Sequence, residues 1–503
     1  MNRLRGTGAL TCAGAVVFGA LAVVDGNQAD AQQPAPTPID RPASIDQRPA
    51  PTPIDQQPAP TSVTRLLGEA TPGAAALGKV RSRLSEVAAG NGLPVAQLER
   101  ILATDKTSWL DADSRLFFRE PTLTASQKSA EASPRWAEQA VAAATGPAFE
   151  LHSKPGSHRV IYLDFDGHTI TGTAWNASKG IDPVKVSPYD ADGDPATFSP
   201  AEQDVVHEVW ARVAEDYATF DVDVTTQEPP QSAIDRSDAS DQQYGTRVLI
   251  DPDTWYQSGC GCGGVAYVGV YDSTSQHDYY QPALVFTKGV GTGAKNLAEA
   301  ASHEAGHNVG LSHDGTSTVG YYQGHGAWAP IMGVGYYRGI SQWSKGEYAD
   351  ANNTEDDYAV VGTHGLALRA DEAGDTTGDA AALTVGTPVS GVIAAESDTD
   401  VYRVDVGAAG NYIATASSAP TGGDLDIKLD LLDSSGAVVA SADPASGQAD
   451  AGTPTGLGAS VSSTLQPGTY YLRIDNVGYG DPLNTGYSTY GSRGAYTLGI
   501  TPS

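Results

Sequence analysis

HEAGHNVGLSHDG, at residues 303–315, is the stretch that decides the fold of the middle of this chain. On a helix, His303 and His307 are four residues apart, so both imidazoles leave the same face. Glu304 follows the first histidine, where its carboxylate can reach a metal-bound water without binding the metal. Gly310 can adopt a positive φ and end the helix, so that the chain folds back and His313 supplies a third imidazole.

Three neutral histidines around a zinc ion leave one tetrahedral position open for water, which is the arrangement of catalytic rather than structural zinc sites. The alternative interpretation is an ordinary amphipathic helix that carries His and Glu. That interpretation would suit a bare H-E-x-x-H, but here a glycine and a third histidine also stand at the required positions. We therefore predict a zinc site with His303, His307 and His313 as ligands and Glu304 beside them.

A methionine downstream supports the same prediction. Apart from Met1, the chain has one methionine, Met332, nineteen residues after His313. H-E-x-x-H-x-x-G-x-x-H followed by a Met-turn is the metzincin signature, and the motif resembles the adamalysin (reprolysin) branch, including Asp314 after the third histidine. The resemblance implies a zinc endopeptidase with Met332 under the metal and Glu304 as general base. As an alternative, Met332 fills a gap in the core.

One departure from the family pattern concerns tyrosine. Many metzincins place a tyrosine two residues after the methionine, whereas here Gly333-Val-Gly335 precedes Tyr336 and Tyr337. The resemblance therefore does not assign a transition-state role to either tyrosine.

The N-terminal part of the sequence is typical of an exported precursor. Residues 1–31 have arginines, an apolar stretch and a small-residue site, as in a secretory signal peptide. Residues 32–62 form a Pro-rich linker, and the helical periodicity of residues 63–146 predicts a propeptide, with a permanent accessory domain as the alternative. Because the only upstream cysteine, Cys12, lies in the signal, any latency must use a carboxylate or steric occlusion of the cleft.

Residues 151–367 are predicted to be the catalytic domain, an α/β (α+β) metzincin-like unit with a mixed, twisted five-stranded sheet and a zinc helix from about Lys295. A second helix is expected over residues 201–217. The strand at 265–270 would be a free edge above the cleft, able to pair with an extended peptide. Capping-box patterns at 344–347 and 354–357 follow, and the second is expected to start the last helix. The five expected strands are residues 159–165, 222–226, 247–250, 265–270 and 283–287.

After a linker at 368–379, residues 380–503 alternate short strands with Gly-, Asp- and Ser-rich turns, which predicts an antiparallel β-sandwich. Residues 398–402, 431–436, 468–471 and 496–498 resemble, in that order, the bacterial pre-peptidase C-terminal domain. That family is found after the catalytic domain of secreted peptidases. The sequence does not identify a ligand for this domain.

The chain is acidic and poor in cysteine. Its net charge of −30 disfavours nucleic acid and anionic membranes and favours divalent cations, and no segment after the signal is apolar enough to span a membrane. Asp190, Asp192 and Asp194 are spaced to bind Ca²⁺, although a solvated acidic loop is the alternative. Cys260 and Cys262 are expected to form a disulfide, with free thiols or a redox motif as alternatives.

Several other polar groups are expected to be structural rather than metal ligands. Asp164 and Asp166 end the first strand and are expected to form a hydrogen-bonded turn. His325 is expected to have a loop role, because three ligands are already assigned. A structural role is likewise expected for the sandwich carboxylates Asp398, Asp400, Asp424 and Asp426.

Together these features predict a secreted, extracellular zinc endopeptidase that acts on proteins or peptides, binds zinc and a second metal, calcium, and is made as a zymogen. The competing hypothesis is an inactive metzincin scaffold that binds a surface or matrix through its C-terminal sandwich. The sequence does not reveal the substrate, the cleavage preference or the oligomeric state.

Overall fold

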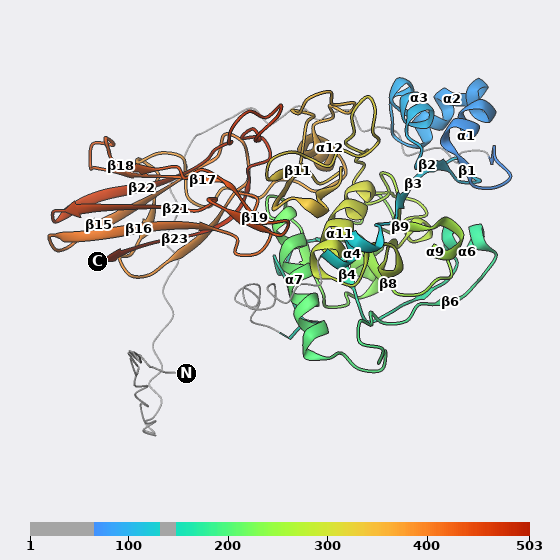
Figure 1. Ribbon diagram of the computed structural model, residues 1–503, viewed down its shortest axis with the longest axis horizontal. Helices are drawn as coiled ribbons and strands as arrows, with labels where there is room; N and C mark the ends of the chain where they lie inside the picture. The colour runs from blue at the N-terminus through green and yellow to red at the C-terminus, as the bar shows by residue number, and fades with distance from the viewer. Residues whose placement is uncertain (1–64, 131–146) are drawn as a thin grey trace, which may run out of the picture. The chain divides into compact units, whose positions relative to one another are not determined.

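The computed structural model describes residues 65–130 and 147–503 (Figure 1). The predicted signal peptide, the Pro-rich linker and the last part of the predicted propeptide lie outside the described residues. The described chain is mixed α/β with several sheets and a β-rich C-terminal region.

The largest sheet has eight strands in the order β1-β2-β3-β9-β10-β8-β4-β7. Its second half contains the five predicted strands: β4 is parallel to both β7 and β8, β8 is parallel to β10, and β9 is antiparallel to β10. All eight residues of β8 are buried, as expected for a parallel strand covered on both faces. The five strands are β4 (Arg159–Asp164), β7 (Asp223–Thr225), β8 (Tyr244–Asp251), β9 (Cys262–Tyr267) and β10 (Ala283–Phe286).

Two long helices pack together against this sheet, α7 (Pro200–Asp216) and α11 (Ala294–Asn308). The first turn of helix α7 is stabilised by its own sequence, because Ser199 and Glu202 form a capping box and Pro200 is the first helical residue. Helix α11 is rich in alanine and almost wholly buried, so it can approach the sheet closely. Tyr217 Oη donates to the Ser302 carbonyl oxygen at 3.0 Å, which ties the end of α7 to α11.

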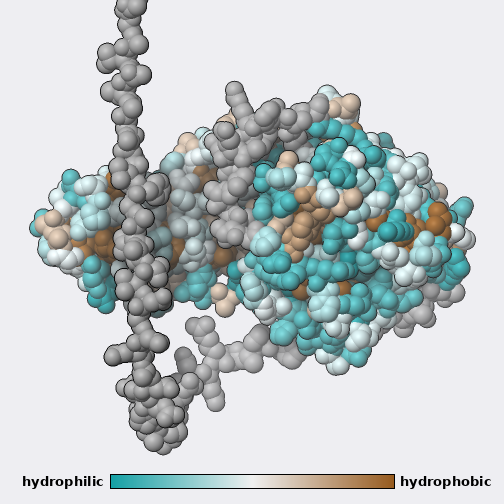
Figure 2. Space-filling model, turned by 90° about the horizontal axis from the view of Figure 1, so that it is seen from below, coloured by the Kyte–Doolittle hydropathy of each residue, from teal (hydrophilic) through white to brown (hydrophobic). Residues whose placement is uncertain are grey.

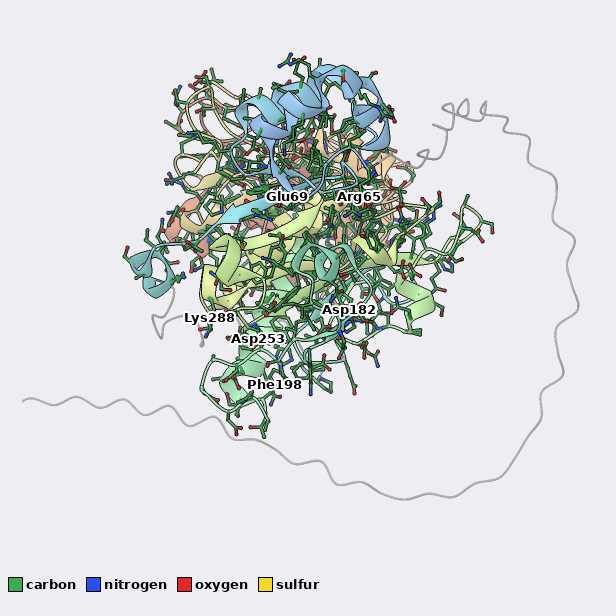
Figure 3. The ribbon with its side chains drawn as sticks, turned by 90° about the vertical axis from the view of Figure 1, so that its right-hand side faces the viewer. Arg65, Glu69, Asp182, Phe198, Asp253 and Lys288 are labelled. Carbon is green, nitrogen blue, oxygen red and sulfur yellow. A yellow bond between two sulfur atoms is a disulfide. The ribbon has the colours of Figure 1, made fainter. Side chains whose placement is uncertain are left out.

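The described part of the predicted pro-region contains three α-helices, then the hairpin β2–β3 and the short helix α4. Figure 3 shows its blue helices, with Arg65 and Glu69 at the start of this segment. The prediction that β9 is a free edge is wrong for this chain, because β3 pairs with β9 in antiparallel fashion and extends the sheet. Sequence periodicity identifies strands but not their partners. The elements are β1 (Thr71–Pro72), α1 (Gly73–Val80), α2 (Leu84–Gly90), α3 (Val95–Thr104), β2 (Ser108–Leu110), β3 (Leu116–Pro121) and α4 (Ala125–Ala130).

The C-terminal region forms two facing sheets, of five strands (β13-β15-β22-β17-β18) and four strands (β14-β23-β16-β21). All pairs are antiparallel except β13 with β15. Alternate residues of β15 and β16 are buried, which forms the core between the sheets. The strands are β13 (Ala381–Leu383), β14 (Val389–Ile393), β15 (Thr399–Val406), β16 (Gly410–Ser418), β17 (Ile427–Leu432), β18 (Val438–Ala442), β21 (Ala459–Leu465), β22 (Gly468–Asn476) and β23 (Gly494–Pro502).

The pattern at Ser344 does not start a helix. The last helix of this region, α12, begins at Asp357 within the second pattern, as predicted, but its N-cap is Asp356 rather than Thr354, with the Asp356 carboxylate accepting from the Ala359 backbone N–H. The remaining elements are short: β5 (Thr169–Ile170), α6 (Ala174–Lys179), β6 (Val184–Lys185), α8 (Gln231–Ile234), α9 (Gln257–Cys260), α10 (Thr287–Val290), β11 (Trp328–Pro330), β12 (Ile340–Gln342), α12 (Asp357–Thr363), β19 (Gly447–Asp450) and β20 (Thr453–Thr455).

Candidate metal centre

Three histidines converge at the C-terminal end of α11. His303 and His307 lie on one face of the helix, and the turn after it brings His313 back, so that the Nε2 atoms of His307 and His313 are 3.0 Å apart. All three side chains are buried. Gly310 makes this turn possible, because it has a φ of +97° and a Cβ there would lie 2.4 Å from the His364 ring.

The other nitrogen of each imidazole is held by an acceptor. Nδ1 of His303 lies 2.9 Å from the Ile331 carbonyl oxygen and Nδ1 of His307 lies 2.8 Å from that of Leu311. Nδ1 of His313 lies 2.6 Å from Asp105 Oδ2. Protons on the Nδ1 atoms leave the Nε2 lone pairs facing one another, which is the tautomer and orientation that a metal-binding imidazole needs.

Burial affects the protonation of these histidines differently. Burial lowers the pKa of His303 to about 3 and also lowers the pKa of His307, so both are neutral at physiological pH. For His313, burial acts in the same direction but is outweighed by the charges of Glu120 and Asp105, which raise its pKa to about 10. A metal ion would therefore displace a proton from His313 on binding.

Glu304 supplies the clearest evidence that the site fits a cation. Its side chain is fully buried, and neither carboxylate oxygen has a hydrogen-bond partner among the described residues; His303 Nε2 also lacks one. Burial and then the charge of Glu120 raise the pKa of Glu304 well above its usual range. A divalent cation among the imidazoles would act in the opposite direction and favour the carboxylate. The donor set of three imidazoles, with a bare carboxylate beside it, fits zinc.

A fourth residue at the centre was not predicted from the sequence. Glu120, from β3, is buried and belongs with the three histidines to a group whose ligand atoms all lie within 4.8 Å of one another. Glu120 Oε1 lies 3.0 Å from His313 Nε2 and 3.5 Å from His307 Nε2, while Oε2 lies 3.6 Å from His303 Nε2. Nothing in the segment Arg119-Glu120-Pro121 marks it as a ligand, because Glu120 is 193 residues from His313 in the sequence.

The predicted support residues Met332 and Asp314 are both buried. Met332 is fully buried, and its Sδ packs on the helix at Gly306, where a Cβ would come within 2.6 Å of it. The Met332 carbonyl oxygen accepts from the Asp314 backbone N–H at 2.8 Å, which joins the Met-turn to the segment after the third histidine. Burial and the charge of Glu355 raise the pKa of Asp314 to about 8.

A small cleft opens beside the histidines, lined by residues of β3, β9, α11 and the loop after the Met-turn. Tyr336 and Tyr337 both line it, and Tyr337 Oη accepts from Gln127 Nε2. Tyr321, which sequence reasoning missed, lies closer to the ligands, with its ring centroid 4.3 Å from that of His313.

His325 has the predicted loop role, with its nitrogens near Tyr322 Oη and the Gly486 carbonyl oxygen, both at 2.7 Å.

The other candidate sites lie apart from this centre. Cys260 and Cys262 are joined in a disulfide with a Cα–Cα distance of 5.2 Å. Asp164 forms a buried ion pair with Arg247. In the sandwich, Asp398 and Asp400 gather with Asp371, whereas Asp424 and Asp426 are not in that group.

The acidic loop differs in one residue from the predicted calcium ligands. Asp190 and Asp192 gather with Glu202 of α7, and Asp194 lies outside this group. Asp194 instead accepts from the backbone N–H of Ala196 and the hydroxyl of Thr197. The sequence spacing missed Glu202 because Glu202 belongs to the following helix.

We predict that millimolar calcium raises the thermal unfolding midpoint of the protein above that in magnesium at equal ionic strength. An ion that binds only the folded state adds RT ln(1 + [L]/Kd), about 2.7 kcal/mol at a hundredfold excess over Kd. Equal ionic strength removes the difference in charge screening. Asp192→Asn should reduce the calcium effect, and equal midpoints in the two salts would leave this loop as solvated surface.

Comparison with protein families gives two matches. Residues 212–314 match the family described as Metallo-peptidase family M12B Reprolysin-like, and residues 398–476 match the Bacterial pre-peptidase C-terminal domain. Both resemblances noted in the sequence are thereby confirmed. A comparison with curated proteins found no match.

Among solved structures, the pre-peptidase C-terminal domain of collagenase from Bacillus anthracis is 20% identical, with 26% of this chain and 97% of that chain covered and a TM-score of 0.17. PliG of Aeromonas hydrophila, a periplasmic lysozyme inhibitor, is 14% identical, with 24% and 98% covered and a TM-score of 0.16.

Proposed function

We propose that this chain, which carries a reprolysin-like M12B metallopeptidase domain and a bacterial pre-peptidase C-terminal domain, is a zinc-dependent endopeptidase. The observation that carries the proposal is the arrangement at α11. Ligand nitrogens of the three imidazoles lie within 4.8 Å of one another, and neither oxygen of the Glu304 carboxylate has a hydrogen-bond partner among the described residues. His303, His307 and His313 would hold the metal.

A bound zinc ion would polarise the scissile carbonyl and lower the pKa of a water molecule. Glu304 would accept a proton from the attacking water onto one of its two free carboxylate oxygens as the water oxygen bonds to the carbonyl carbon, and would pass this proton to the amine nitrogen as the C–N bond breaks. The hydrogen bonds at Nδ1 of His303 and His307, to the carbonyl oxygens of Ile331 and Leu311, keep these two imidazoles in the required orientation. Strand β9 would offer its backbone to an extended peptide once β3 has left it.

We further propose that the protein is exported and acts outside the cell on proteins or peptides. The pre-peptidase C-terminal domain supports this, since it is typical of secreted bacterial proteases. None of the helices in residues 65–130 and 147–503 combines the length and the apolar character that a membrane crossing requires. The face drawn in Figure 2 is mostly hydrophilic, in keeping with the net charge of −30.

Purified protein from culture, incubated with casein or gelatin, tests the proposal. We expect degradation of the substrate, its loss after treatment with 1,10-phenanthroline, and its recovery on addition of one equivalent of zinc. Metal analysis should show one zinc per chain. A processed, zinc-loaded protein that cleaves neither substrate would instead support the hypothesis of a binding scaffold.

A further inference from the structure

We propose that the N-terminal segment of this chain is an internal inhibitor of the peptidase, in which the Glu120 carboxylate is the fourth ligand of the metal. The inference rests on the proposed function, because it concerns the regulation of the same site. It assigns a metal-binding role to a residue outside the metallopeptidase match at 212–314. Three independent features of the structure support it.

The first feature is the spacing of the four ligand atoms. A tetrahedral zinc ion with bonds of about 2.0–2.1 Å has ligand atoms about 3.3 Å apart. Glu120 Oε1 lies 3.0 Å from Nε2 of His313 and 3.5 Å from that of His307, and the other carboxylate oxygen, Oε2, lies 3.6 Å from Nε2 of His303. The Nε2 atoms of His307 and His313 are 3.0 Å apart. The carboxylate therefore stands at the corner of the tetrahedron that a water molecule would take in an active enzyme.

The second feature is the way in which β3 aims Glu120 at this corner. Strand β3 pairs with β9 from Phe117–Tyr267 to Pro121–Cys262, and between Arg119–Val265 and Pro121–Cys262 strand β9 has one residue more than β3, so that Glu120 lies opposite a β-bulge in β9. Bulges are common next to functional sites. Phe118, two residues earlier on the same face, packs its ring 4.6 Å from that of His307 and 4.1 Å from that of His313.

The third feature is that the same segment holds His313 from its other side. Asp105 Oδ2 lies 2.6 Å from Nδ1 of His313, and Asp105 Oδ1 accepts from the backbone N–H and the hydroxyl of Thr107. The Thr107 hydroxyl also accepts from Tyr321 Oη at 2.9 Å. The N-terminal segment thus contacts the third ligand at both ring nitrogens, so its removal would free one face of the metal and leave His313 without its Asp105 partner.

These contacts block the site in two ways at once. Glu120 takes the position that water needs, and β3 takes the backbone of β9 that a peptide substrate would pair with. The device needs no thiol, in agreement with the absence of any cysteine between the predicted signal and Cys260. Activation requires hydrolysis of a peptide bond after β3 ends at Pro121 and before β4 begins at Arg159.

The test uses the full-length precursor with Glu304→Gln, which prevents self-cleavage, and with cobalt in place of zinc. Acetohydroxamic acid, a small ligand that needs an open metal position, is the probe, and the visible spectrum of cobalt is the readout. We expect the unaltered Glu120 precursor to bind the probe at least tenfold more weakly than Glu120→Gln. Transfer of zinc to a chelator should likewise be at least tenfold faster in Glu120→Gln.

The matched control is Glu99→Gln, an exposed pro-region carboxylate paired with Arg81, which should change neither quantity. Glu120→Asp, which shortens the side chain by one methylene, should give an intermediate probe affinity and covers the case in which Glu120→Gln fails to fold. Equal probe affinities in Glu120, Glu120→Asp and Glu120→Gln precursors that all hold one metal would overturn the inhibitor proposal alone. Failure of every precursor to bind a metal would overturn the proposed function as well.

Discussion

Replacement of Glu304 by glutamine is expected to leave zinc in place and to lower peptidase turnover by two to four orders of magnitude, on the order of what a general base contributes. Glutamine has nearly the same shape, so the helix and the three histidines should keep their positions. It cannot accept a proton at neutral pH, so the water would lose its base. Hydrolysis of a fluorogenic peptide by the processed protein, together with zinc analysis, measures both effects.

The matched control is Glu299→Gln, one turn earlier on the same helix. Glu299 pairs with Lys295 and accepts from the Ser341 hydroxyl, and it is absent from the cleft lining that contains Glu304. Its replacement should change turnover by less than threefold. Near-normal turnover by a zinc-loaded Glu304→Gln protein would contradict the proposed mechanism, whereas loss of zinc in that variant would leave its activity uninformative.

The sequence predicts those residues of the metal centre that lie on one helix and on the turn after it. Residues four apart on a helix share a face, and Gly310 at +97° allows the turn that returns His313. These relations are local, so spacing alone specifies them. Glu120 and Asp105 reach the same site across 193 and 208 residues. Their placement depends on the strand with which β3 pairs, and the spacing of residues in the sequence does not predict that pairing.

The fold likewise has elements that the sequence predicts and pairings that it does not. Strands β4, β8 and β10 and helices α7 and α11 could be located from the pattern of apolar residues. The role of β9 could not, because periodicity predicts a strand without showing whether its outer edge is free or paired. The second capping prediction failed for a related reason. Asp356 and Thr354 both have side chains that can cap a helix, and only the packed structure selects Asp356.

Gly264→Ala is expected to lower turnover by about a hundredfold while zinc remains bound. A Cβ at this position of β9 would lie 1.9 Å from Glu304 Oε1 and 2.7 Å from its Cδ, so the carboxylate would have to move. Displacement of a catalytic group by about 1 Å can cost about 10²-fold in rate. Gly362→Ala is the control within the same domain, since a Cβ there meets nothing within 4 Å, and its turnover should be unchanged.

The double variant distinguishes displacement of Glu304 from damage to peptide binding on β9. If Gly264→Ala acts by moving Glu304, it should cost little further in a protein that already carries Glu304→Gln, because two changes that disable the same group are not additive. If it acts on the strand that would pair with the substrate, the loss should be as large in the double variant as in the single one. That second outcome would assign Gly264 to substrate binding and remove the steric argument for its contact with Glu304.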